Sequence, residues 1–347
     1  MASIAAPAPS RTDIQARPRA IAAWLLFVAA MVFTMVVVGG ITRLTESGLS
    51  ITRWDVVSGT LPPLNDAAWA AEFEAYRQSS QYRLLNQGMD LAAFKHIFFW
   101  EYVHRLLGRL IGLAFALPLA WFWLRRAIPA GYKPRLLALL MLGGLQGTIG
   151  WWMVSSGLVD RAAVAHERLA VHLFTALTIM AGCMWTALDL LRREAPVAAR
   201  PHRWVVPFAL LLAVQIIWGA FVAGMRAGHV SDTWPLMFGR LVPPDLVTRA
   251  ADLIDSPLTV HFLHRTLGIF VALAALHVAA KLWRAGAGPR ALALGGAVVA
   301  QFGLGVATVL SGVAIPLGVA HQAVGALLVA ATAWAAHWAV QARGVHK

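Results

Sequence analysis

Eight apolar stretches of roughly 20 residues recur along this chain, and they constrain its fold more than any other feature. A helix of that length is about 30 Å long, which matches the hydrocarbon core of a bilayer. Only 13% of the 347 residues are charged, against about 25% in an average soluble domain. We therefore predict an all-α integral membrane protein with eight transmembrane helices. The spans are expected at residues 21–42, 94–124, 134–154, 170–191, 204–224, 258–284, 289–311 and 320–341.

The positions of the basic residues predict the orientation of the chain. Its net charge of +13 could indicate nucleic-acid binding, but the arginines and lysines gather in alternate connections between the spans. This alternation follows the positive-inside rule. It argues against nucleic-acid binding and places both termini in the cytoplasm. The connections 43–93, 155–169 and 225–257 and the turn 312–319 are then expected to face outward.

Cysteine content and the N-terminal sequence exclude several classes of protein. Cys183 is the only cysteine, so the chain can form no internal disulfide, zinc ribbon or covalent c-type haem link. Residues 1–20 lack an apolar core and read as a cytoplasmic tail rather than a cleaved signal. A mitochondrial transit peptide is the alternative, which Asp13 and three prolines weaken. The short tail and the alanine and arginine content favour a bacterial plasma membrane.

The first outer connection contains a segment of mixed character at 66–90. Its apolar residues Trp69, Phe73 and Tyr76 lie among charged ones. This spacing predicts a helix over the outer face, with an ordinary solvated loop helix as the alternative.

The second half of the chain repeats the first. Segment 39–54, GGITRLTESGLSITRW, aligns without a gap with segment 219–234, GAFVAGMRAGHVSDTW. Likewise EYVHRLLG at 101–108 aligns with HFLHRTLG at 261–268. Such duplication is expected when one binding site is copied. Each half supplies four spans in the same order.

We therefore expect two tandem, pseudo-symmetric four-helix bundles. The predicted parts are the tail 1–20, a first half 21–192, a cytoplasmic linker 193–203, a second half 204–341 and a cytoplasmic tail 342–347.

Four histidines recur at matching places, His104 and His172 in the first half and His264 and His321 in the second. All four are expected at the outer ends of their helices. Two histidines at equal depth on two helices of a bundle can hold a haem iron between them. His166 competes with His172, and the repeat favours His172 because it aligns with the start of the last span. A zinc-protease motif is absent, since the HExxH pattern that begins at His166 has alanine at position 170.

The neighbours of these histidines support a haem. Gly108 and Gly268 follow their histidines by one helical turn, so they share a helix face with them and would let a flat macrocycle lie close to the backbone. Arg105 and Arg265 could pair with haem propionates.

The two halves differ one turn before the first histidine of each pair. Glu101 precedes His104, and its counterpart before His264 is His261. A carboxylate near a haem edge can accept protons or stabilise positive charge during an oxidation; a solvated carboxylate at a helix mouth is the alternative. The asymmetry indicates that one haem transfers electrons while chemistry takes place at the other.

These residues resemble those of the haem A synthase family. The match covers nearly the whole chain and includes GGITRLTESGLSITRW, EYVHRLLG, HERLAVHL, HFLHRTLG and HQAVGALL. Because the outer connections lack cysteines, the chain resembles the proteobacterial and mitochondrial branch rather than the branch with a cysteine pair in the first outer loop.

The resemblance implies oxidation of the methyl group at position 8 of haem O to a formyl group, giving haem A, through successive hydroxylations and loss of water. By the same resemblance, His264 and His321 bind a resident haem b that carries electrons. His104 and His172 hold the substrate haem O or the product haem A, with Glu101 beside the reacting edge.

The resemblance also implies partners and a location. The partners are the lipid bilayer, a haem O synthase, terminal-oxidase assembly factors and an electron-transfer partner that the sequence does not identify. A homo-oligomer is compatible with the sequence, and the haem sites are expected toward the periplasmic side.

The strongest rival is a di-haem electron-transfer cytochrome that exchanges electrons with quinone. It shares the four histidines but has no need of Glu101 in one half alone. A haem transporter is a third, weaker reading.

Overall fold

The described part of the chain is mainly helical. The computed structural model describes residues 16–53, 58–158, 161–191 and 202–340, and these contain no named strand. Among them, eight helices are long and apolar enough to cross a membrane, which confirms the predicted fold class. Most of the predicted tail 1–20, most of the linker 193–203 and the tail 342–347 lie outside the described residues. The eight helices are α2 (Pro18–Leu44), α5 (Leu91–Leu124), α6 (Lys133–Ser155), α7 (His166–Leu190), α8 (His202–Met225), α10 (Pro257–Arg284), α11 (Gly288–Leu310) and α12 (Ile315–Val340).

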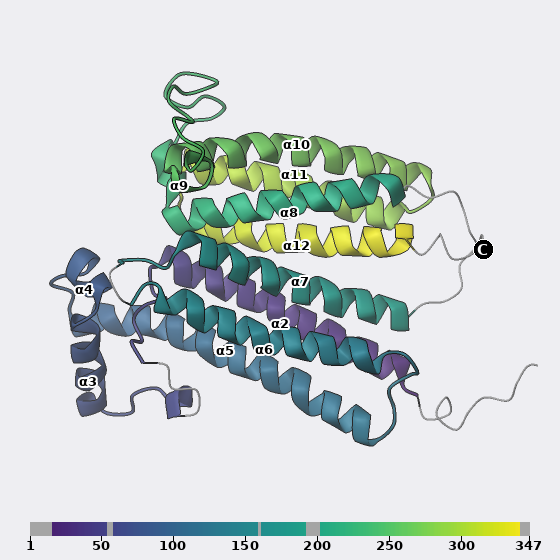
Figure 1. Cartoon of the computed structure of the whole chain (residues 1–347), viewed down its shortest axis with the longest axis horizontal. Coiled ribbons are helices and arrows are strands. Elements are labelled where there is room, and N and C mark those ends of the chain that lie inside the picture. The colour runs from purple at the N-terminus through teal and green to yellow at the C-terminus, as the bar shows by residue number, and fades with distance from the viewer. Residues whose placement is uncertain (1–15, 54–57, 159–160, 192–201, 341–347) are drawn as a thin grey trace, which may run out of the picture.

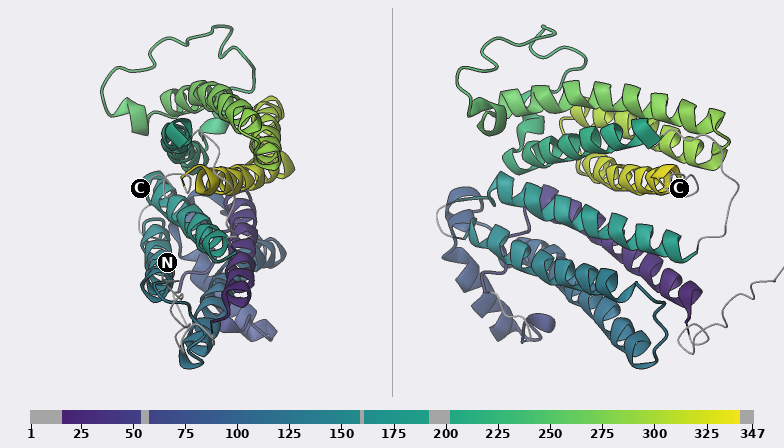
Figure 2. Two further views of the ribbon diagram at one scale, coloured as in Figure 1. Left: turned by 90° about the vertical axis from the view of Figure 1, so that its right-hand side faces the viewer. Right: turned by 45° about the vertical axis from the view of Figure 1, so that its right-hand side comes forward.

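The long helices run side by side in two groups of four (Figure 1). Helices α2, α5, α6 and α7 form one group, and α8, α10, α11 and α12 form the other, as the turned views in Figure 2 also show. Each group packs around its own cluster of buried apolar side chains. The two groups are called the first and second half below.

All eight long helices begin earlier than hydrophobicity predicts, by one to five residues. Helix α5 starts at Leu91 because Asp90 caps it, its carboxylate accepting a hydrogen bond of 2.8 Å from the amide of Ala93. Helix α7 starts at His166 rather than at 170, and α12 at Ile315 rather than at 320. The apolar run underestimates α7 because the polar residues His166, Glu167 and Arg168 continue the helix before it, whereas the residues that open α12 are themselves apolar.

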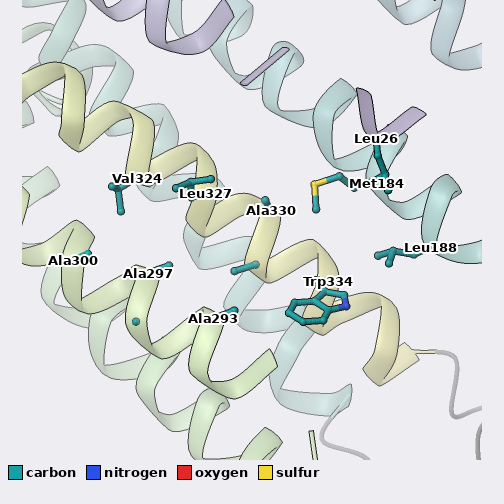
Figure 3. Close-up of a pocket in the computed structure, with 12 residues that line it drawn as sticks. Leu26, Met184, Leu188, Ala293, Ala297, Ala300, Val324, Leu327, Ala330 and Trp334 are labelled. Carbon is teal, nitrogen blue, oxygen red and sulfur yellow. The ribbon is translucent and has the colours of Figure 1, made fainter. Parts of the chain in front are cut away.

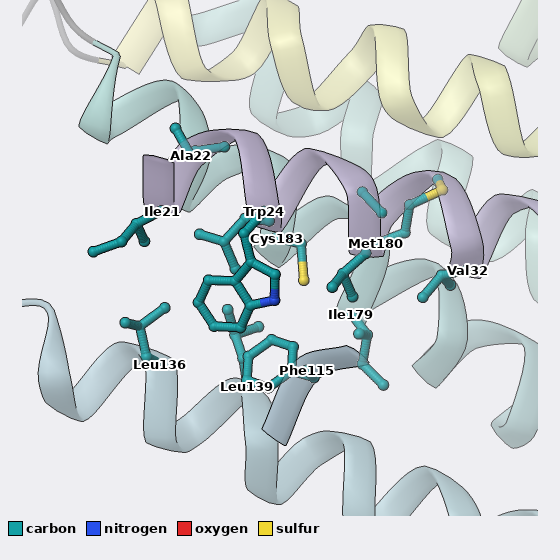
Figure 4. Packing of buried hydrophobic residues seen from close by; sticks show 14 of the residues in the cluster. Ile21, Ala22, Trp24, Val32, Phe115, Leu136, Leu139, Ile179, Met180 and Cys183 are labelled. Atoms are coloured by element: carbon teal, nitrogen blue, oxygen red, sulfur yellow. The ribbon is translucent and has the colours of Figure 1, made fainter. Parts of the chain in front are cut away.

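The core of the first half is built around a tryptophan (Figure 4). The Trp24 indole donates a hydrogen bond of 2.7 Å to the carbonyl of Ala114, and its ring centre is 4.9 Å from that of Phe115. Cys183 and Met180 from α7 are buried in the same cluster. The indole N–H is thus satisfied inside an apolar region, where an unpaired donor would be costly.

The first long connection folds into a lobe over the start of α5. The helix predicted there is present as α3 (Asp66–Arg77) and α4 (Ser80–Leu85). The rings of Tyr76 and Phe94 stack with centres 5.2 Å apart, and both side chains are fully buried. Burial raises the pKa of Tyr76 above its ordinary value, and its hydroxyl accepts a hydrogen bond of 2.7 Å from Asn86. The end of the molecule that carries α3 and α4 is called the lobed end below.

The two halves join through two equivalent contacts. Helix α2 packs against α12, and α8 packs against α7. Leu44 lies against Gly318 in the first contact, and Leu169 lies against Gly224 in the second. Because α8 repeats α2 and α12 repeats α7 in the sequence, these contacts join equivalent helices of the repeat.

We predict that Gly224→Ala destabilises the contact between the halves. A Cβ atom at Gly224 would lie 2.5 Å from the Cβ and 2.7 Å from the Cα of His166, so the backbones of α7 and α8 must separate. Overpacking of this kind costs about 1–3 kcal/mol, and it should lower the thermal unfolding midpoint in detergent. Gly143→Ala in α6 is the control, because a Cβ atom there meets nothing within 4 Å. Equal midpoints for the two variants would contradict the prediction.

Candidate functional site

Each of the four repeated histidines lies against a glycine of a neighbouring helix. A Cβ atom on any of these glycines would approach the histidine Cε1 atom to 3.2 Å or less, so each ring lies closer to the neighbouring helix than a side chain there would normally allow. The pairs are His104 with Gly39, His172 with Gly150, His264 with Gly219, and His321 with Gly305.

In the second half the two histidine rings lie at a spacing that fits one metal between them. The ring centres of His264 and His321 are 6.5 Å apart and the planes are nearly perpendicular, at 88°. An imidazole nitrogen coordinates a metal at about 2 Å and lies about 1 Å from its ring centre, so two imidazoles on opposite sides of one metal have centres about 6 Å apart. The observed spacing therefore leaves room for one metal between the two rings.

In the first half, His104 and His172 lie near each other, and each is seated against a glycine of a neighbouring helix. His166 lies elsewhere, against Phe221 of the second half, with ring centres 5.3 Å apart. The structure thus brings His172 rather than His166 to His104.

Sequence reasoning missed a pattern that surrounds all four histidines. One turn before each of the four glycines stands Met35, Gln146, Gln215 or Gln301. The signal was present as MVVVG, QGTIG, QIIWG and QFGLG, four copies of one spacing. Each half is therefore itself a repeated helix pair.

The glutamines of this pattern contact the second helix of their pair. Gln146 Nε2 donates to the carbonyl of His172 at 3.0 Å and lies 3.2 Å from its Nδ1. Gln215 Nε2 donates to the carbonyl of His264 at 3.0 Å and lies near Gly268. These two glutamines therefore link each neighbouring helix to the backbone of the helix that carries the histidine.

Met35 replaces glutamine in the pair that carries His104. Its terminal methyl lies 3.6 Å from where a Cβ atom of Gly108 would be. The position of Met35 is therefore apolar, whereas the equivalent positions beside the other three histidines carry an amide.

Glu101 is buried in a network that holds the first connection. It is 3% exposed, so the alternative of a solvated carboxylate is wrong. One carboxylate oxygen accepts hydrogen bonds from the Ser50 hydroxyl at 2.7 Å and the Ile51 amide at 2.8 Å, and the other accepts from Arg105 at 2.6 Å. Arg105 also donates to the carbonyls of Ile51 and Arg53, each at 2.8 Å. A charge-assisted network of this kind fixes a negative charge one turn from His104.

The second half keeps the arginine of this network and replaces the carboxylate. Arg265 donates to the carbonyls of Thr233 at 2.9 Å and Pro235 at 3.1 Å, and its guanidinium lies over the Trp234 ring. His261 stands in place of Glu101 and is buried. Both arginines thus bind carbonyls of a connection, and their contact with haem propionates stays a prediction.

The donor set fits a haem better than a bare metal ion. Among the described residues, no group of three or more histidine, cysteine, aspartate or glutamate side chains could hold a metal ion. A porphyrin supplies four nitrogens itself and needs only one or two axial ligands. His104 Nδ1 and His264 Nδ1 are buried with no hydrogen-bond partner among the described residues. Two paired histidines without further metal-binding side chains therefore suit a haem, because the porphyrin supplies the remaining four nitrogen ligands.

A separate cavity lies between the halves (Figure 3). It has a volume of about 580 Å³, and none of the four histidines lines it. Its walls are apolar and come from four helices, with side chains that include Leu26, Met184, Leu188, Ala297, Leu327 and Trp334.

Comparison with known proteins identifies relatives along nearly the full chain. The family model COX15-CtaA, described as cytochrome oxidase assembly protein, matches residues 22–333. A protein named heme A synthase from Erythrobacter litoralis is 53% identical over 328 residues, covering 92% of this chain and 96% of its own. Proteins of the same name from Novosphingobium aromaticivorans and Rhodospirillum centenum are 51% and 49% identical; they cover 96% and 95% of this chain and 98% and 91% of their own.

We predict that Gly305→Ala lowers the amount of haem held in the second half by several-fold. The added Cβ atom would lie 2.9 Å from His321 Cε1 and would push the ring away from its present position beside His264. The haem-to-protein ratio of the purified variant, measured from its visible absorbance, tests this. Gly303→Ala, two residues away on α11, meets nothing within 4 Å and should match the unmodified protein. A normal ratio in Gly305→Ala would show that the close approach of His321 to α11 is not needed to hold the haem.

Proposed function

The chain belongs to the COX15-CtaA family of cytochrome oxidase assembly proteins, and on that premise we propose how its two halves divide the conversion of haem O to haem A. The first half holds haem O between His104 and His172. The second half holds a resident haem b between His264 and His321. The observation that carries this proposal is the facing pair of rings, 6.5 Å apart in the second half, together with the repetition of its glycine contacts in the first half.

The proposed reaction oxidises its substrate, so electrons must leave the methyl carbon. Conversion of a methyl group to a formyl group, through two hydroxylations and loss of water, removes four electrons from that carbon. Haem b, when bound by His264 and His321, supplies one-electron transfer. A second haem site in the same chain can carry these electrons, one at a time, to the electron-transfer partner that accepts them.

Glu101 acts in this proposal as a fixed negative charge beside the reacting methyl group. Arg105, Ser50 and Ile51 hold its carboxylate in place. A pre-oriented carboxylate stabilises positive charge that develops as the methyl carbon is oxidised and can accept the proton that leaves it. The second half has His261 at this place, which supports assigning the chemistry to the first half.

Location and partners follow from the same proposal. The chain lies in the bacterial plasma membrane with both termini in the cytoplasm and the lobed end outside, because the basic residues of the connections gather at the opposite end. A haem O synthase supplies the substrate, and terminal-oxidase assembly consumes the product.

The first experiment is chromatography of haems extracted from protein made in a host that produces haem O but no haem A. We expect haem b together with haem A or its hydroxylated precursor. Haem b alone, in an intact preparation with haem O available, would instead support the electron-transfer cytochrome.

We predict that Glu101→Gln slows haem A formation by about a hundredfold while the haem b content stays normal. The substitution removes the charge with little change in volume. Haem A formed per chain and haem b per chain, measured on the same sample, separate the two effects. Glu72→Gln is the control, because Glu72 also pairs with an arginine of the first connection, Arg53, at 2.8 Å. Unchanged turnover in Glu101→Gln would refute the assigned role.

A further inference from the structure

One ion pair joins equivalent positions of the two halves. Glu46 and Arg226 occupy equivalent positions in the aligned segments 39–54 and 219–234, and they pair at 2.7 Å. Both have a left-handed backbone, with φ of 56° and 54°, just beyond the ends of α2 and α8. Each half therefore contributes one partner from the same position of the repeat.

Arg43 breaks this symmetry. Its counterpart in the second half is Ala223. Arg43 Nη2 donates to the carbonyl of Gly224 at 3.1 Å, while its buried Nε has no hydrogen-bond partner in the described part of the chain. Arg226 is near enough to repel it. Two guanidinium groups thus lie near the carboxylate of Glu46, which among the described residues pairs with Arg226 alone.

Helix geometry places the backbone of Arg43 next to the residues of α2 that contact the first-half site. Gly39 faces His104, and Gly40 faces Gln322 of the second half. Arg43 follows Gly39 by four residues and so lies roughly 40° around the helix from it, between these two directions. It stands one turn closer to the lobed end than Gly39.

We propose that Arg43 binds a propionate of the haem in the first-half site. This inference rests on the proposed function and extends it to the orientation of the substrate. A propionate at this place satisfies the unpartnered Nε and balances the second guanidinium. Charge-assisted hydrogen bonds of this kind are among the strongest in proteins.

The contact has a consequence for selectivity. The methyl group at position 8 of a haem is on the same pyrrole ring as one of its propionates. Anchoring that propionate at Arg43 fixes where this methyl group lies relative to Glu101. Ala223 provides no such anchor in the second half, where the proposed haem only carries electrons and needs no fixed edge.

The test compares haem contents of three variants made in the host that supplies haem O. Arg43→Met should reduce the first-half haem, measured as haem O and its oxidation products per chain, by about tenfold, with haem b per chain unchanged. Arg290→Met is the matched control. Arg290 also has a buried Nε without a partner among the described residues, but it lies at the opposite end of the bundle against Trp334, so both haems should stay at normal levels.

Glu46→Gln separates ligand binding from a purely structural role. It removes the carboxylate that competes with the propionate, so it should retain at least the normal first-half haem. Loss of that haem in Glu46→Gln to the same degree as in Arg43→Met would show that Arg43 only joins the halves. Normal haem O in Arg43→Met would overturn the inference alone, whereas unmodified protein without haem O or haem A would overturn the proposed function.

Discussion

The close approach of four histidine rings to four glycines is the contact on which the site depends. Because glycine has no side chain, the ring of His321 lies directly against the backbone of α11 at Gly305, and the other three histidines are seated in the same way. A ring held against a neighbouring backbone has little freedom to turn. The spacing of His264 and His321 is therefore set by helix packing rather than by long flexible side chains.

Duplication explains the shared architecture, and in the proposed function the departures from it carry the chemistry. Glu101 corresponds to His261, Met35 to Gln215, and Arg43 to Ala223. All three differences lie around the first-half histidine pair. The second half keeps a polar, symmetric version of the same site, which suits a group that stays bound, while the first half has acquired a fixed negative charge and an additional cation.

The connections at the lobed end are part of the site rather than a cover over it. Arg105 and Arg265 bind carbonyl groups of the connections 43–93 and 225–257, and Glu101 completes the network of Arg105. A carboxylate and a guanidinium buried together are tolerated only when each is hydrogen-bonded. The network thus ties the position of the proposed catalytic charge to the fold of residues 50–53.

Sequence alone determined the membrane fold, the eight spans and the repeat, because the length of apolar runs and the spacing of repeated residues are local properties. It also singled out the four histidines and Glu101. It placed the starts of α7 and α12 too late, and in α7 the reason is that polar residues open the helix. Only the tertiary structure decided which side chains meet: that His172 lies near His104 while His166 packs against Phe221, that Glu101 is buried among hydrogen-bond donors, and that Arg43 lies between the halves. Those outcomes depend on how one helix rotates against another, and that rotation is fixed by packing between residues far apart in the chain.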